Sequence, residues 1–285
     1  MKSAAGLLKR LVRTLSIVAM VVVGSTILIR FAPGYLSDAR EMDSRYGDAA
    51  RVELSAEAAR STSLKQLLGT EFAGWTHGNL GVSRQYEVPV AELILPRLAV
   101  TGSLLLRAIA LAWTLAFCAA LISSSGRNPS VLWQTPSTLL LAVPTAAMAT
   151  ICMLSDRGGP VLVMTLLVAA RDFKFLDSML RKAWRDPHLL QARAQGLTTV
   201  RLVYAHILPS IASQLLALAT LSIVTALSAL VPVEVIFSVP GVGQLAWNAA
   251  MNRDLPVLLA VTTIMAVAVT CAGMSAERAG EWQGA

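Results

Sequence analysis

Charged residues are scarce in this sequence of 285 residues. They make up 14% of it, against about 25% in a typical soluble domain. Hydrophobic residues make up 55%, and the mean hydropathy is +0.62. A lipid-exposed backbone must satisfy its own hydrogen bonds, which leaves only helices or closed barrels. The apolar runs here are long and continuous, without the short alternating segments of a barrel. The sequence therefore predicts an all-α, polytopic transmembrane bundle.

Cysteine is also rare. Cys118, Cys152 and Cys271 each lie within an apolar run, far apart in the sequence. This spacing predicts neither a disulfide framework nor a cysteine-based metal site. The three histidines fall in three different loop regions and do not have the spacing of metal ligands. We therefore expect no metal site in this chain.

The signatures of common catalytic sites are missing. The chain contains no Gly-Lys pair, which excludes a phosphate-binding loop of the G-x-x-x-x-G-K-[ST] type. It also lacks the H-E-x-x-H and G-x-S-x-G patterns. The sequence therefore predicts a protein that is not an enzyme and binds no ATP or Mg²⁺ itself.

Six apolar runs are long enough to be considered as membrane spans. At about 20 residues for each span, they lie near residues 11–31, 99–122, 135–154, 160–180, 207–231 and 256–275. The first follows a short basic head and ends at Pro33-Gly34 without an A-x-A cleavage site, so we predict an uncleaved anchor. The fourth has only about eleven uninterrupted apolar residues, so it must continue through the charged pair Arg171-Asp172.

The distribution of positive charge predicts the orientation. Residues 171–206 carry seven bases and three acids, whereas residues 38–97 carry nine acids and seven bases. Basic loops stay in the cytoplasm. This rule places residues 171–206 and both termini in the cytoplasm and residues 32–98 outside. It also accounts for the net charge of +7 without any nucleic-acid partner.

The cytoplasmic segment 186–206 has the pattern of a helix–glycine–helix elbow. Residues 188–195 are good helix formers, and Gly196 can adopt the left-handed conformation that ends a helix. A second helix is predicted over 198–206, with Thr198 at its N-cap. Pro209 suits the first turn of the helix that follows. Such an elbow could dock into a groove on a partner, or it could be an ordinary interfacial loop.

The elbow resembles the coupling loop of ABC importer permeases of the oligopeptide, dipeptide and nickel family. The resemblance rests on Ala192-Arg193-Ala194, Gly196 and His206-Ile207-Leu208-Pro209. Four further segments match that family in the same order, and they are Arg30–Gly34, His77–Ser83, Val90–Thr101 and Val233–Gly243 with Asn252–Pro256. Three positions depart from the usual pattern, namely Asn79, Gln195 and Ser210.

The resemblance implies a function, a fold and a set of partners. The chain would have the fold of a type I ABC importer permease, in a bacterial inner (plasma) membrane. It would carry peptides, nickel or a metal–chelator complex from an external binding protein into the cytoplasm. It would pair with a second homologous permease and with two ATPases, which use ATP and Mg²⁺. Residues 1–98 would form an anchor and external segment, and residues 99–285 the permease core.

The resemblance also assigns roles to single residues. Coupling to the ATPases would involve residues of the elbow, namely Asp186, Ala192, Arg193, Ala194, Gly196, His206 and Pro209. The loop 232–256 would help to form the outer mouth through Pro240, Gly241 and Gly243. Glu234, Arg107 and Arg171 are candidates for the translocation pathway. Glu234 could instead cap a loop, and Arg107 could extend to the membrane surface. A six-helix secondary transporter or channel is the competing class, although we find neither inverted repeats nor paired broken spans.

Overall fold

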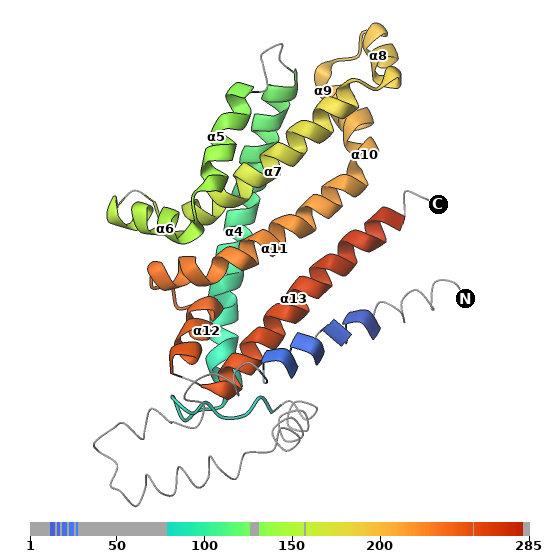
Figure 1. Ribbon diagram of the computed structural model, residues 1–285. Coiled ribbons are helices and arrows are strands. Elements are labelled where there is room, and N and C mark those ends of the chain that lie inside the picture. The colour runs from blue at the N-terminus through green and yellow to red at the C-terminus, as the bar shows by residue number, and fades with distance from the viewer. Residues whose placement is uncertain are drawn as a thin grey trace, which may run out of the picture. The chain divides into compact units, whose positions relative to one another are not determined.

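The computed structural model describes most residues between 12 and 27, together with residues 79–125, 131–156, 158–252 and 254–281. Within these ranges the chain is helical apart from short connections and one isolated bridge between Val82 and Pro89 (Figure 1). Contacts divide the chain into two compact units. The first contains Met1–Val100 and Pro240–Thr270, and the second contains Thr101–Val239 and Cys271–Ala285.

The first unit has a hydrophobic core of its own. It contains the start of α4 (Val90–Ser125), all of α12 (Val242–Met251) and most of α13 (Leu255–Glu281). Val90, Ile94, Leu245, Val257 and Val261 are among the buried residues that pack together there. Aliphatic side chains spaced three to four residues apart thus bring one face of each helix into a common core.

The second unit is built around α7 (Pro160–Trp184) and α11 (Ala212–Ile236), which contact each other. Two shorter helices, α5 (Val131–Ala142) and α6 (Thr145–Leu154), also contact α7. In α4, the alanines at 108, 112, 116 and 120 are all buried at a spacing of four residues. Small residues in such a row allow helix backbones to approach closely, and the hydroxyl of Thr165 on α7 donates to the Ala108 carbonyl.

Three of the described helices are long and apolar enough to cross a membrane. They are Val90–Ser124, Ala212–Ile236 and Leu255–Met274, and the bent pair α5–α6 makes a fourth if it is counted as one span. The predicted fourth span corresponds to α7, which carries six charged residues and is not among these three apolar helices. In the predicted first span, the residues between 12 and 27 that the structure describes are helical. Most of the predicted external segment, up to residue 78, lies outside the described residues.

The predicted third span, 135–154, is not one continuous helix. The structure has two helices there, α5 and α6, bent by 95° at a short break, and the bend is visible in Figure 1. Pro144 occupies the N-cap of α6 with an extended conformation (φ −57°, ψ 138°). Proline has no N–H for the preceding helix and disfavours a helical residue before it. The break therefore occurs at Pro144, whose effect on the backbone does not show in an averaged hydropathy.

Two other predicted boundaries are also corrected. The fifth span was placed at 207–231, but α11 begins at Ala212 and continues to Ile236. The segment 232–256, predicted to be a loop, contains the end of α11 and the whole of α12. The α11 terminus is closed by two hydrogen bonds, from the Val239 N–H to the Glu234 carbonyl and from the Ser238 N–H to the Val235 carbonyl. Ser238 has φ +52°, so this is the left-handed helix ending that glycine more often provides.

Candidate functional site

The predicted elbow is present as a sharply turned pair of short helices. α8 spans Pro187–Ala194, and α9 spans Thr199–Leu202 with Thr198 at the N-cap position. Gly196, between them, has φ +79°. A Cβ atom built on Gly196 would have no heavy atom within 4 Å. The need for glycine at this position is therefore a matter of backbone conformation and not of space.

The second arm of the elbow differs from the single helix predicted over 198–206. α9 has only four residues and continues into a π-helical turn, Val203–Ile207, which is followed by α10 (Leu208–Ser210). Pro209 lies in the first turn of α10, and Ile211 separates α10 from α11. The Thr198 side chain makes no capping hydrogen bond. One-turn π-bulges occur frequently at functional sites, and this one contains His206.

One face of the elbow belongs to the hydrophobic core of the second unit. Leu189 and Ala192 of α8 are buried in it. The second arm contributes Leu202, Val203 and Ile207 to the same cluster. The rest of that cluster comes from α4, α7 and α11, and includes Ala116, Ala120, Phe173, Leu176, Leu180 and Leu218. The elbow is thus packed against three long helices through its buried face.

The opposite face of the elbow is exposed and partly apolar. Val200 and Tyr204, four residues apart, are 67% and 68% exposed, and Arg201 between them is also exposed. Asp186 is exposed and its carbonyl accepts the Leu189 N–H at the start of α8. His206 is half-buried, and its Nδ1 atom has no hydrogen-bond partner among the described residues. The side chains of Arg193 and Ala194 lie outside the described part of the structure.

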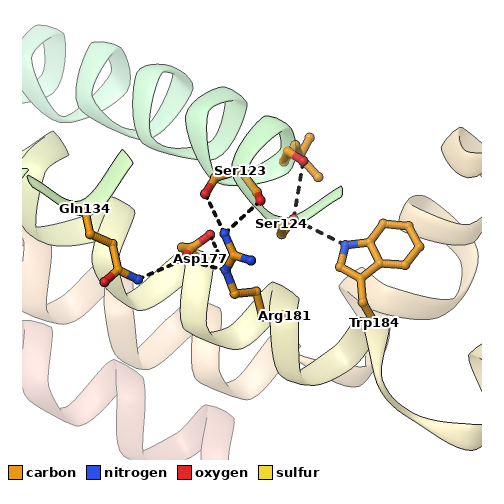
Figure 2. A network of polar contacts seen from close by, with 7 residues as sticks. Ser123, Ser124, Gln134, Asp177, Arg181 and Trp184 are labelled. Atoms are coloured by element: carbon orange, nitrogen blue, oxygen red, sulfur yellow. Dashed lines mark hydrogen bonds and ion pairs between the residues drawn. The ribbon is translucent and has the colours of Figure 1, made fainter. Parts of the chain in front are cut away.

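A polar network fastens α7 just before the elbow (Figure 2). Arg181 Nε donates to both carboxylate oxygens of Asp177, at 3.0 and 2.9 Å. Arg181 Nη2 donates to the carbonyl and hydroxyl oxygens of Ser123 on α4, at 2.8 and 2.7 Å. From α5, Gln134 Nε2 lies 3.3 Å from Asp177 Oδ2, and Trp184 Nε1 donates to Ser124 at 3.3 Å. Sequence reasoning missed this network, although the Asp177–Arg181 spacing of four residues is typical of a helix ion pair.

The three candidates for the translocation pathway lie in different surroundings. Glu234 is fully buried within α11, where it accepts a hydrogen bond from the Thr101 hydroxyl at 2.7 Å. Arg107 is exposed, and its guanidinium donates to the carbonyl and hydroxyl oxygens of Ser103, four positions earlier on the same helix. Arg171 is half-buried, donates to the Thr225 hydroxyl and lines a cavity in the second unit. The structure therefore does not bring these three side chains together.

Two motifs that are distant in the sequence meet within the first unit. The carboxylate of Asp254 is fully buried and receives the Ser83 hydroxyl. It also accepts the backbone N–H groups of Arg84 and Gln85, at 3.2 and 3.3 Å. The Ser83 hydroxyl in turn accepts the Tyr86 N–H at 3.0 Å. Hydrogen bonds from several donors offset the cost of burying a carboxylate. The contact therefore holds the turn before α4 against the start of α13.

The three residues assigned to the outer mouth surround the start of α12. Pro240 is exposed, and Gly241 is the N-cap of α12 with an extended backbone (φ −105°, ψ −173°). Gly243 is buried in the first turn of the helix. The outer-mouth assignment of these residues stays a prediction, because their geometry alone identifies no ligand.

The sequence of this chain is similar to a known protein family and to several known proteins. Residues 98–283 match the model of the family described as binding-protein-dependent transport system inner membrane component. A probable peptide ABC transporter permease of Sinorhizobium fredii is 24% identical, with 91% of each chain covered. A dipeptide transport system permease of Lactococcus lactis is 26% identical over 67% of this chain and 69% of its own. A metal-staphylopine import system permease of Staphylococcus aureus is 31% identical over 38% of this chain and 34% of its own.

Proposed function

The chain belongs to the family of binding-protein-dependent transport system inner membrane components, and on that premise we propose that it is one of two permease subunits in a peptide importer. It is a transport component of an ABC system and not an enzyme. The similarity to peptide permeases extends over most of the chain, whereas the similarity to the metal-staphylopine permease covers about a third of it. Peptides are therefore the favoured cargo, with a metal–chelator complex as the second candidate.

The observation that carries this proposal is the two-sided elbow. Its inner face is part of one hydrophobic core with α4, α7 and α11, and its outer face exposes Val200 and Tyr204. A helix surface with exposed apolar anchors four residues apart suits a hydrophobic groove on a partner. Force applied to this face is transmitted to the long helices, because closely packed interiors are not continuously deformable. The elbow is accordingly the site where a partner ATPase moves this subunit.

The proposal includes three kinds of partner. A second, homologous permease completes the pathway, and two ATPases bind ATP and Mg²⁺ and contact the elbows. An external binding protein delivers the cargo. The competing class, a six-helix secondary transporter, lacks support in the family match and in the relatives.

Reconstitution tests the function directly. Purified alone and placed in liposomes, this chain is expected to show neither ATP hydrolysis nor peptide uptake. Co-expression with a second permease and two ATPases is expected to give a four-subunit complex that accumulates peptide when both ATP and loaded binding protein are present. Peptide transport by this chain alone would contradict the subunit assignment.

Site-specific labelling tests the proposed orientation, in which both termini and the elbow are cytoplasmic. In a variant whose three cysteines are replaced by serine, a cysteine at the exposed position Gln195 should react with an impermeant reagent only after cells are permeabilised. A cysteine at Ala250, exposed on α12, should react in intact cells. Reaction of the Gln195 position from outside would rule out both the orientation and the coupling role of the elbow.

A further inference from the structure

A cavity of about 600 Å³ lies in the second unit, among α5, α6, α7 and α11. Its volume falls within the range of pockets that take small ligands. Apolar side chains form most of its wall, and they include Phe175. Its polar lining consists of Arg171, Lys174, Thr145, Thr225 and Ser228, so two cations and three hydroxyl groups but no acid face the space.

No acidic residue among those that line this cavity offsets its two positive charges. Arg171 donates to the neutral Thr225 hydroxyl, and neither Arg171 nor Lys174 has a carboxylate partner in the part of the chain that the structure describes. Asp172, next to Arg171 in the sequence, attracts it electrostatically but is fully buried away from the cavity lining, and its Oδ2 accepts the Ser222 hydroxyl. Unpaired charge inside a helical bundle is costly and marks substrate or ion pathways.

The cavity also lies at the middle of the two helices that form it. Arg171 is eleven residues after the start of α7, and Thr225 is thirteen residues after the start of α11, each helix having 25 residues. At 1.5 Å per residue, Arg171 is about 16 Å from the beginning of α7. If α7, the predicted fourth span, crosses the bilayer together with α11, this depth is close to the midplane of a hydrocarbon core about 30 Å thick.

The first turn of α6 adds donors of the same sign. α6 has ten residues and begins at Thr145, one of the lining residues. Its N-cap, Pro144, offers no side-chain hydrogen bond. The first amide groups of a helix have no acceptor within it and carry partial positive charge. The start of α6, the Arg171 guanidinium and the Lys174 ammonium therefore all favour an anionic ligand.

We infer that this cavity binds the terminal carboxylate of a peptide in transit, with Arg171 and Lys174 as its counter-ions. The inference rests on the proposed function for the identity of the cargo. A guanidinium and an ammonium suit an oxyanion, and the apolar wall suits the side chains beside it. Every peptide with an unmodified C-terminus carries this carboxylate, so the site recognises peptides without regard to side-chain sequence. A lipid phosphate shares the chemistry but belongs at the bilayer surface, about 15 Å away.

A chemical probe of the cavity tests the inference without relying on transport. In a cysteine-free background, Ser228→Cys places a thiol on the lining, and the four-subunit complex is placed in phosphatidylcholine nanodiscs. The measured quantity is the ratio of the labelling rate with an anionic sulfonate thiol reagent to the rate with its quaternary ammonium analogue. We expect this ratio to be at least about tenfold higher at the Ser228→Cys position than at an exposed reference cysteine, because clefts of one charge concentrate counter-ions 10- to 1,000-fold. Adding Arg171→Gln and Lys174→Gln should remove the preference. Adding Arg171→Lys should keep most of it.

Protection identifies the ligand. Trialanine at millimolar concentration should slow labelling of the Ser228→Cys complex, and trialanine amide, which lacks the carboxylate, should not. Equal protection by both peptides, or an equal rate with both reagents, would overturn the inference. Protection that appears only when phosphatidylglycerol is added to the nanodiscs would assign the site to lipid and would also overturn it. The proposed function is read from ATP-dependent uptake instead, so each can fail while the other stands.

Discussion

Replacing Gly196 with valine is expected to reduce ATP-dependent peptide uptake to a small fraction of the wild-type rate, with insertion and expression near normal. Gly196 has φ +79°, and a non-glycine residue in the left-handed region costs roughly 1–2 kcal/mol. β-Branched side chains are the worst there. This cost is small against the stability of a helical bundle. It corresponds, however, to a factor of about 5–30 in the population of the turn that aims the elbow.

The open surroundings of Gly196 make the expected series specific. Since no heavy atom lies within 4 Å of a Cβ built there, side-chain size alone should not matter. Asparagine tolerates the left-handed region better than other residues, so Gly196→Asn should retain more uptake than Gly196→Ala, and Gly196→Val least. Recovery of the ATPase subunits with the purified permease should fall in the same order. An order that follows side-chain volume, with asparagine as poor as valine, would contradict the backbone explanation.

The control variant has to be chosen from the structure. Gly158 is unsuitable, because its φ is +118° and a Cβ atom would lie 2.4 Å from Leu162 Cδ2. Gly159 has an extended backbone (φ −104°, ψ −176°) with no atom within 4 Å of a Cβ. It precedes Pro160, a position that favours extended residues. Gly159→Val should therefore transport peptide at close to the wild-type rate. Wild-type uptake by Gly196→Val would show that the elbow is not the coupling element.

The elbow and the helical class were predictable because each depends on local chemistry. Long apolar runs with few charges require helices, and the left-handed turn at Gly196 follows a run of good helix formers that ends in glycine. The extent of the second arm was not predictable in the same way. Its π-helical turn, Val203–Ile207, is part of the buried cluster that includes Leu180 and Leu218. Tertiary packing, which sequence propensity does not contain, thus replaces four-residue with five-residue spacing there.

The errors in the membrane spans have a common origin. A hydropathy window averages over about 20 residues, so Pro144 does not interrupt the predicted span 135–154 although it bends the chain by 95°. The predicted fifth span ends at residue 231, whereas α11 continues through Glu234, whose carboxylate is buried and accepts the Thr101 hydroxyl. One acid with a partner is compatible with a buried helix. The local sequence around Glu234 does not reveal Thr101 as its partner, because 133 positions separate the two residues.

The polar network in front of the elbow depends on pairing across three helices, and its loss is expected to have the largest effect on stability. Arg181→Met removes the cation from Asp177, whose side chain is 1% exposed. Among the described residues, only the contact from Gln134, at 3.3 Å, then remains to this carboxylate. Leaving one member of a buried ion pair unpaired costs about 3–5 kcal/mol. We expect the lower end of that range, because the Arg181 side chain is 26% exposed.

The second substitution in this test is Asp177→Leu, alone and together with Arg181→Met. Removing both charges leaves no unpaired carboxylate, and replacement of a buried ion pair by apolar residues is often close to neutral. The double variant should therefore unfold at a temperature near that of the wild type. Arg181→Met alone should lower the midpoint for the detergent-solubilised complex by on the order of 5–10 °C. Lys182→Met, an exposed neighbour on the same helix, is the matched control and should change the unfolding free energy by less than about 0.5 kcal/mol.

The same set of complexes separates stability from coupling. Arg181 also holds the Ser123 carbonyl and hydroxyl of α4, and α7 ends three residues later, at Trp184. The pair thus fixes the helix end from which the elbow continues, and the methionine of Arg181→Met has no donor that could replace the contacts to Ser123. We expect the double variant to keep its thermal midpoint while its ATP hydrolysis responds less to loaded binding protein than in the wild type. If the two single losses of stability simply add in the double variant, then Asp177 and Arg181 are not energetically coupled, and the network does not hold α7 in the way proposed.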